Sequence, residues 1–190
     1  EYLTTTYYPP KDFLASPALV DDLIMLRLVD LKKVLSFGKI PRRLECYDIS
    51  NIQGKYATGS MVVFINGVSA KDQYRRFKIK FSKTPNDFEM LKEVLSRRFK
   101  NNWPLPDLII IDGGKGQLSS AVEIAQKYDI KVPIISISKR YEQIHIHQKL
   151  LPIKLSHTSP ARQLVQSTRD EAHRFAITYH RHLRSKDFIK

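Results

Sequence analysis

The sequence predicts an α/β fold in which helices flank a mixed β-sheet. Three features predict it: an apolar run at 108–112 with the length of an interior strand, an Asn66-Gly67 turn between two strand-like segments, and apolar residues at helical spacing after Asn86. Continuous apolar strands are typical of sheets covered on both faces. At 190 residues, the chain is long enough for one domain with a well-buried core.

The expected elements occur in the order β-β-β-α-β-α-β-α. The five strands are expected near 44–50, 56–65, 73–81, 108–112 and 134–138. The first helix follows Asn86, an N-cap with Glu89 in a capping-box pattern, and its expected apolar face consists of Phe88, Leu91, Leu95 and Phe99. The second helix is expected at 117–128, and the last begins at Ser159-Pro160 and continues to about 183. The irregular stretch 139–157 has room for a further short hairpin.

Residues 1–40 and 41–190 are expected to differ in role. The first segment has a helical pattern but no recognisable motif, so we interpret it as an N-terminal helical extension or linker. The order of elements in 41–190 is that of the ribonuclease H-like arrangement, in which active-site acids lie on the first and fourth strands and a last residue lies on the final helix. We therefore expect a ribonuclease H-like mixed five-stranded sheet flanked by helices.

The charge of the chain restricts its partners. It has 32 Lys and Arg against 19 Asp and Glu, which gives a net charge of +13. This excess favours a polyanion such as nucleic acid, and a basic surface kept for solubility is the alternative. No apolar run is long enough to cross a bilayer, and the single cysteine, Cys46, excludes a disulfide or a cysteine-based zinc site within the chain. We expect a reducing compartment and no membrane contact.

Two aspartates occupy predicted strands, Asp48 near the end of the first and Asp112 at the end of the fourth. If these strands are neighbours, the two carboxylates converge, and a cation between them relieves their repulsion. Hard oxygen ligands suit Mg²⁺ or Mn²⁺. The alternative is that each aspartate only caps a turn or a helix.

His173 is the third candidate for this site. It lies outside the apolar arc of the last predicted helix, in a polar stripe with Arg162 and Arg169 that suits a phosphate-binding cleft. An imidazole there serves as a metal ligand, a general acid or a general base, and a solvated surface histidine is the alternative. Asp87 begins a helix, where the helix dipole favours a negative charge; the alternative is a supporting role near the metal.

The strand expected at 73–81 is a candidate for DNA contact. Its residues alternate, so that apolar side chains face one way and Arg76, Lys78 and Lys80 face the other, at a spacing that follows a phosphate backbone. A basic edge strand also protects against aggregation, so both interpretations stay open.

The glycine-rich segment 113–116 is a second candidate for DNA contact. Its backbone N–H groups and Lys115 are suited to a phosphate next to the metal, and Gln117 follows directly. The segment does not match the P-loop pattern, which argues against nucleotide hydrolysis.

These segments together resemble the C-terminal endonuclease half of the UvrC family of bacterial nucleotide excision repair. The motifs that carry the resemblance lie between residues 43 and 184 in the order found in the family. The most telling are Glu45-Cys46-Tyr47-Asp48-Ile49-Ser50, Tyr74-Arg75-Arg76-Phe77-Lys78-Ile79-Lys80, Asn86-Asp87-Phe88 and Arg169-Asp170-Glu171-Ala172-His173-Arg174-Phe175-Ala176-Ile177-Thr178.

The resemblance implies a metal-dependent DNA endonuclease domain with an Asp-Asp-His site. Asp48 and Asp112 match the metal-binding aspartates, His173 matches the third member, and Asp87 matches an acid linked to the same incision. It also implies lesion-containing double-stranded DNA as the substrate, a cut on the 5′ side of the lesion, a UvrB-type damage-recognition partner, and a cytoplasmic, nucleoid-associated location. The family's N-terminal nuclease, its UvrB-binding segment and its C-terminal DNA-binding module have no counterpart in this sequence, so we expect a piece of a longer protein.

Two other functions are alternatives to this hypothesis. One is a catalytically silent DNA-binding or docking module, against which the paired strand-borne acids argue. The other is another ribonuclease H-like nuclease, such as a junction resolvase, against which the motif at 169–178 argues. We expect a monomer, because the sequence has neither coiled-coil heptads nor a large apolar helix face.

Overall fold

The computed structural model describes residues 17–50, 57–80, 86–138 and 143–187, with side chains described from 19 to 178 within these ranges. Residue 81 of the predicted third strand and residues 139–142 of the irregular stretch lie outside them. The elements are α1 (Pro17–Val34), β1 (Arg43–Ser50), β2 (Thr58–Ile65), β3 (Val68–Ser69), the 3-10 helix η2 (Lys71–Gln73), β4 (Arg75–Lys78), α2 (Asp87–Phe99), β5 (Leu108–Asp112), α3 (Lys115–Lys127), β6 (Ile134–Ser138), β7 (Gln143–Ile146) and α4 (Pro160–Asp187).

The predicted mixed sheet flanked by helices is confirmed. Its strand order is β3-β2-β1-β5-β6-β7, with β4 also paired to β2. The pairs β1–β5 and β5–β6 are parallel, and the others are antiparallel. The predicted number of five strands is wrong, since the described residues form a sheet of seven. The strand expected at 73–81 is present only as the shorter β4, whereas β3 precedes the expected range and is separated from β4 by η2. The strand β7 lies in the stretch where a short hairpin was expected.

The predicted turn at Asn66-Gly67 connects β2 to β3. Both residues have positive φ, 50° and 80°, as a type I′ turn requires, and glycine adopts such a φ without steric cost. After η2 the chain continues antiparallel to β2, so that β3 pairs with one end of β2 and β4 with the other. The edge of the sheet is therefore built from two short strands instead of one long one.

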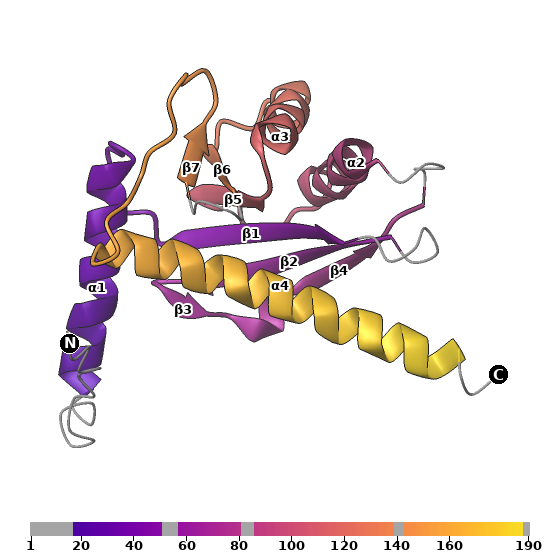
Figure 1. Ribbon diagram of the computed structural model, residues 1–190, viewed down its shortest axis with the longest axis horizontal. Helices are drawn as coiled ribbons and strands as arrows, with labels where there is room; N and C mark the ends of the chain where they lie inside the picture. The colour runs from indigo at the N-terminus through magenta and orange to yellow at the C-terminus, as the bar shows by residue number, and fades with distance from the viewer. Residues whose placement is uncertain (1–16, 51–56, 81–85, 139–142, 188–190) are drawn as a thin grey trace, which may run out of the picture.

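Helices cover both faces of the sheet, α1 and α4 on one and α2 and α3 on the other (Figure 1). Successive strand residues point to opposite faces, so Leu44 and Cys46 of β1 enter the core under α1 and α4. Tyr47, between Cys46 and Asp48 in the chain, enters the core under α2 and α3. Asp48 consequently faces the side of the sheet that carries α4.

The helix α1 is packed into this core. Leu28 and Leu31 are fully buried, and the carboxylate of Asp30 accepts hydrogen bonds from Ser159 Oγ (2.8 Å) and the N–H of Ala161 (2.9 Å) at the start of α4. A side chain of α1 therefore caps α4. Residues 1–16 lie outside the described part of the chain, and the division at residue 40 stays a prediction.

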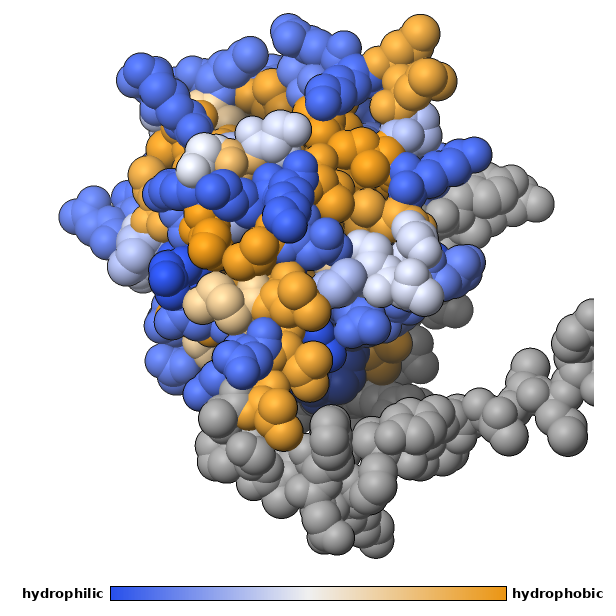
Figure 2. All heavy atoms as spheres, turned by 90° about the vertical axis from the view of Figure 1, so that its left-hand side faces the viewer, coloured by the Kyte–Doolittle hydropathy of each residue, from blue (hydrophilic) through white to orange (hydrophobic). Residues whose placement is uncertain are grey.

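The outer side of α1 is apolar at the surface. Leu19, Leu23 and Leu26 are 40%, 50% and 51% exposed. Figure 2 shows the side of the molecule on which α1 lies, with apolar side chains at its surface. None of the described helices is both long enough and apolar enough to span a bilayer.

The predicted N-cap of α2 is confirmed, because Asn86 Oδ1 accepts the N–H of Phe88 at 3.0 Å. The predicted capping-box role of Glu89 stays a prediction; its carboxylate lies 3.3 Å from Lys92 Nζ. The expected apolar face is partly wrong. Leu91 and Leu95 are buried, but Phe88 is 46% exposed, with the edge of its ring against Gly116 of α3. Arg98, which the sequence pattern does not place inside, is fully buried.

The buried charge of Arg98 is paired with Glu45 of β1. Arg98 Nη2 and Nε donate to the two carboxylate oxygens of Glu45 at 2.8 and 3.0 Å, and Tyr47 Oη donates to the same carboxylate at 2.7 Å. Arg98 Nη2 also donates to the carbonyl of Pro104 at 2.7 Å. This bidentate pair joins the last turn of α2 to β1.

Replacing Arg98 by leucine leaves the buried carboxylate of Glu45 without its bidentate partner, with only Arg43 Nη2 and Tyr47 Oη beside it. We expect Arg98→Leu to lower the free energy of unfolding by about 3–5 kcal/mol, as measured by urea denaturation. The control is Lys131→Leu, which removes an ion pair with Asp129 whose two side chains are both exposed and which therefore contributes little to stability. Equal losses in the two variants would contradict a structural role for the buried pair.

Candidate active site

The parallel pairing of β1 with β5 brings two aspartates together. Tyr47 is in register with Ile111, and the next residues along the two strands are Asp48 and Asp112. Both lie toward the carboxyl ends of their strands, on the face of the sheet that carries α4, and both are buried. The convergence predicted from the strand positions is therefore present.

The helix α4 adds His173 to these carboxylates. It is attached to the sheet next to this residue: Tyr74 packs edge-on against Phe175 at 5.1 Å and donates a hydrogen bond from Oη to Glu171 at 3.0 Å. Arg76 lies over the ring of Phe175 at 4.3 Å. These contacts determine which side of α4 faces the end of β1.

The three side chains form a compact group. One ligand atom each of Asp48, Asp112 and His173 lies within 4.8 Å of the others. His173 Nδ1 is 3.2 Å from Asp48 Oδ2, which also accepts a hydrogen bond from Ser50 Oγ at 3.2 Å. The imidazole is 52% exposed while the Asp48 carboxyl is buried, so the group is open on the side of α4.

This group fits a divalent metal ion. Two buried carboxylates side by side repel each other, and a cation removes that repulsion. Ser60, which is paired with Asp48 across the strands, is fully buried, and its hydroxyl has no hydrogen-bond partner among the described residues. A polar hydroxyl left over beside the carboxylates is consistent with a hydrated ion at this position.

The cysteine beside the group is an inert thiol. Burial, and then the negative charges of Asp112 and Asp48, raise the pKa of Cys46 well above its usual value. The thiol therefore stays protonated and is suited neither to nucleophilic attack nor to metal binding.

A cavity of about 220 Å³ opens beside the group and is lined by Asp112, Arg169, Asp170 and His173. Arg169 and His173 of the predicted polar stripe thus line the same cavity as Asp112, and a contact of Arg169 with DNA stays a prediction. Arg169 Nη2 lies 2.7 Å from Asp170 Oδ1. The sequence interpretation gave Asp170 no role; its position in the same motif as His173 was the available signal.

The predicted basic strip lies in line with the carboxylates. Arg76 of β4 is in register with Ser60, which is in register with Asp48, so these side chains point to the same face of the sheet. Lys78 is on the same face, and both basic residues are exposed. Lys80 is also exposed but follows the end of β4, where its N–H donates to Glu93.

Four other predicted residues lie outside the Asp-Asp-His group. Asp87 begins α2, and Gln117 lies in the first turn of α3, where its Oε1 accepts the N–H of Gly114 at 3.2 Å. Lys115 Nζ donates to the carbonyl of Leu150 at 3.2 Å. Arg162, near the start of α4, is half-buried. The roles assigned to these residues stay predictions.

Comparison with known proteins agrees with this geometry. The sequence model of the UvrC RNAse H endonuclease domain matches residues 32–177. The chain belongs to this UvrC domain family. The UvrABC system protein C of Dictyoglomus thermophilum is 46% identical over 176 residues, which cover 90% of this chain and 29% of that protein. The UvrABC system protein C of Dehalococcoides mccartyi is 50% identical over 169 residues, covering 84% and 28%.

The domain therefore spans less than a third of the length of these UvrC relatives. Among solved structures, endonuclease V of Ciona intestinalis in complex with a 24mer DNA containing an inosine followed by a ribo-adenosine is similar, with a TM-score of 0.48 and 11% identity. The similarity covers 92% of this chain and 100% of that one.

Binding of a cation between the aspartates is expected to stabilise the fold. At 100 times its Kd, Mn²⁺ should raise the Tm by roughly 5–10 °C. In Asp112→Asn, the repulsion is absent, so the Tm without metal should not fall, and the shift caused by Mn²⁺ should disappear. Differential scanning calorimetry measures both effects. Asp129→Asn, an exposed carboxylate at the end of α3, is the matched control; an unchanged shift in Asp112→Asn would contradict the site.

Proposed function

We propose that this UvrC domain is a DNA endonuclease that hydrolyses a phosphodiester with Mg²⁺ or Mn²⁺. The observation that supports it is the Asp48–Asp112–His173 group at the carboxyl end of β1 and β5, in a chain of an endonuclease family. A divalent ion supplies the Lewis acid that stabilises the charge of the phosphodiester and favours an activated water. Asp48 and Asp112 are the residues that would hold it.

His173 is suited to move a proton at this site. When Nδ1–H donates to Asp48 Oδ2, the other ring nitrogen, Nε2, carries the lone pair and can accept a proton. The buried carboxylate of Asp48 orients the ring, which is half-exposed and therefore open to substrate. A direct ligand role for the same imidazole is the second possibility within this proposal.

The DNA backbone has a basic path to the site. Arg76 is two strands away from Asp48 across the sheet, about 10 Å at the usual strand spacing. Lys78 extends the path along β4, and Arg169 lies at the cavity beside Asp112. These cations would bind and orient the phosphates on either side of the bond that is cut.

The family points to a role in nucleotide excision repair. We assign to this domain the 5′ incision in lesion-containing double-stranded DNA, with a UvrB-type protein recruited through other parts of the longer relatives. The domain would act as a monomer in the bacterial cytoplasm, associated with the nucleoid. Asp87 would support the incision from the start of α2.

Cleavage of an end-labelled duplex containing a bubble tests the enzymatic activity. With Mn²⁺ we expect nicking that falls roughly a thousandfold in Asp112→Asn, because the ion loses one of its two carboxylates. Asp129→Asn should cut as the wild type does. Cleavage retained by Asp112→Asn would contradict the site, and DNA binding without any cleavage by the wild type would favour the silent DNA-binding module.

The salt dependence of DNA binding tests the basic path. Each lysine that contacts a phosphate contributes about 0.9 to the slope of log Kd against log salt concentration. We expect Lys78→Ala to reduce the slope by that amount, and Lys127→Ala, at the far end of α3, to leave it unchanged. Fluorescence anisotropy with labelled DNA measures the slope. Equal slopes for wild type and Lys78→Ala would show that β4 does not contact the backbone.

A further inference from the structure

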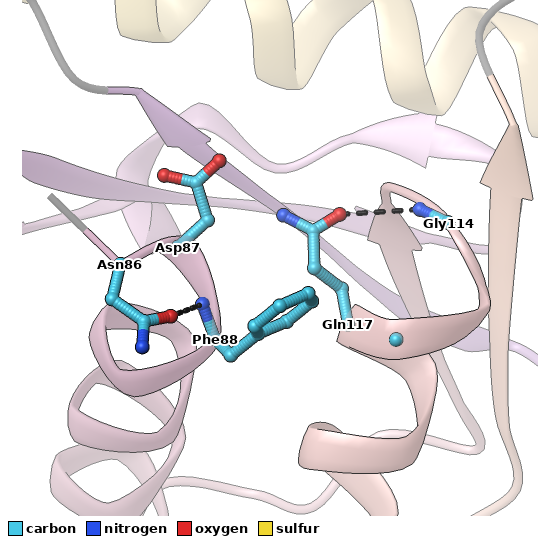
Figure 3. A pocket seen from close by; sticks show the side chains of 6 residues that line it. Asn86, Asp87, Phe88, Gly114 and Gln117 are labelled. Atoms are coloured by element: carbon cyan, nitrogen blue, oxygen red, sulfur yellow. Dashed lines mark hydrogen bonds between the residues drawn. The ribbon is translucent and has the colours of Figure 1, made fainter.

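A second, larger cavity lies between the first turns of α2 and α3 (Figure 3). Its volume is about 640 Å³. The residues that line it are Asn86, Asp87, Phe88, Gly114, Gly116 and Gln117. The ring of Phe88 lies between the two helices, and the side chains of Asp87 and Gln117 extend on the same side of the ring. The cavity therefore combines an aromatic ring, a carboxylate and a carboxamide.

The aromatic ring at this cavity is exposed but held in place. Phe88 is 46% exposed, although an apolar side chain of this size is usually buried. The edge of its ring rests on Gly116: a Cβ added to that glycine would lie 2.7 Å from Phe88 Cε1 and 2.9 Å from Cζ. A glycine is thus required for the ring to approach the backbone of α3, and the ring offers a surface that costs little conformational entropy to use.

The polar groups of the cavity do not favour a phosphate. The first turns of α2 and α3 have N–H groups that attract anions in other proteins, but one in each is taken by a side chain here. Asn86 Oδ1 accepts the N–H of Phe88, and Gln117 Oε1 accepts the N–H of Gly114. The carboxylate of Asp87 adds a negative charge to the lining. A neutral, planar ligand with hydrogen-bonding edges fits this lining better than an anion.

The cavity is also close to the metal-binding group. Gly114, which lines it, is two residues after Asp112, so their Cα atoms are at most about 7 Å apart. This distance is close to the spacing of neighbouring nucleotides in a single strand. A ligand in the cavity and a phosphate at the carboxylates can therefore belong to the same DNA strand.

We infer that this cavity binds an unstacked nucleobase of the strand that is cut, within one or two nucleotides of the scissile phosphate. The base stacks on Phe88, and its polar edge faces Asp87 and the carboxamide of Gln117. The inference rests on the proposed function, since it takes DNA as the substrate. Capture of a base next to the cut holds the backbone in register with Asp48 and Asp112.

A coupling experiment tests the base pocket. Bubble DNA carrying a single abasic site at each successive position of one strand is titrated with the protein in EDTA, so that no cleavage occurs. Removing the base that occupies the pocket should weaken binding roughly tenfold. Phe88→Leu should weaken binding to intact DNA by a similar factor but cause no further loss with that one abasic DNA, because the lost interaction is the same.

Two further variants control for folding and for the aromatic ring. Phe88→Tyr keeps the stacking surface and should bind as the wild type does. Phe99→Leu, at the other end of α2, should leave the abasic profile unchanged. Additive losses at every abasic position, or competition by millimolar inorganic phosphate that depends on Phe88, would overturn the inference. Because binding is measured without metal, failure of the base pocket is distinguishable from failure of the nuclease, which the cleavage assay reports.

Discussion

The parallel pairing of β1 with β5 is the constraint on which the rest of the site depends. Its register places Asp48 beside Asp112, and the burial of both strands removes these carboxylates from water. Two buried like charges oppose folding unless a cation or a hydrogen-bond donor compensates them. The structure supplies His173 and Ser50 on one carboxylate, and the geometry leaves space for an ion between the two. A slip of one residue in this pairing would turn one aspartate to the opposite face.

Different sides of α4 contact the hydrophobic core and the candidate active site. One side of the helix is buried in the core through Leu164, Val165, Ala172 and Ala176. Another side carries Arg169 and His173, which line the cavity. Its first turn is capped from α1 by Asp30, and its middle is attached to the edge of the sheet through Tyr74 and Arg76. The position of the imidazole is therefore determined by contacts with two separate parts of the chain.

The end of β5 connects two environments of different character. On the α4 side, Asp112 belongs to the Asp48–Asp112–His173 group, whose ligand atoms fit a divalent ion. After the two glycines that follow Asp112, the chain begins α3, whose first turn lines a second cavity. The ring of Phe88 in that cavity rests on Gly116. The carboxylates proposed to act at the phosphate and the aromatic cavity proposed to bind a base thus lie on one short segment. The buried pair Glu45–Arg98 supports this arrangement, because it attaches α2, and with it Phe88, to β1.

The sequence by itself determined the features that depend on neighbours in the chain. These are the interior strand at β5, the turn at Asn66-Gly67, the N-cap Asn86 and the positions of the two aspartates on their strands, because periodicity and capping act over a few residues. Only the tertiary structure decided the rest. Arg98 is buried because Glu45, distant in the chain, neutralises it, and no helical pattern reveals such a partner. Phe88 stays 46% exposed although the edge of its ring rests on Gly116 of α3, and the edge of the sheet is divided because η2 separates β3 from β4. Each of these outcomes depends on contacts between segments far apart in the sequence. A local sequence pattern carries no information about the energies of such contacts.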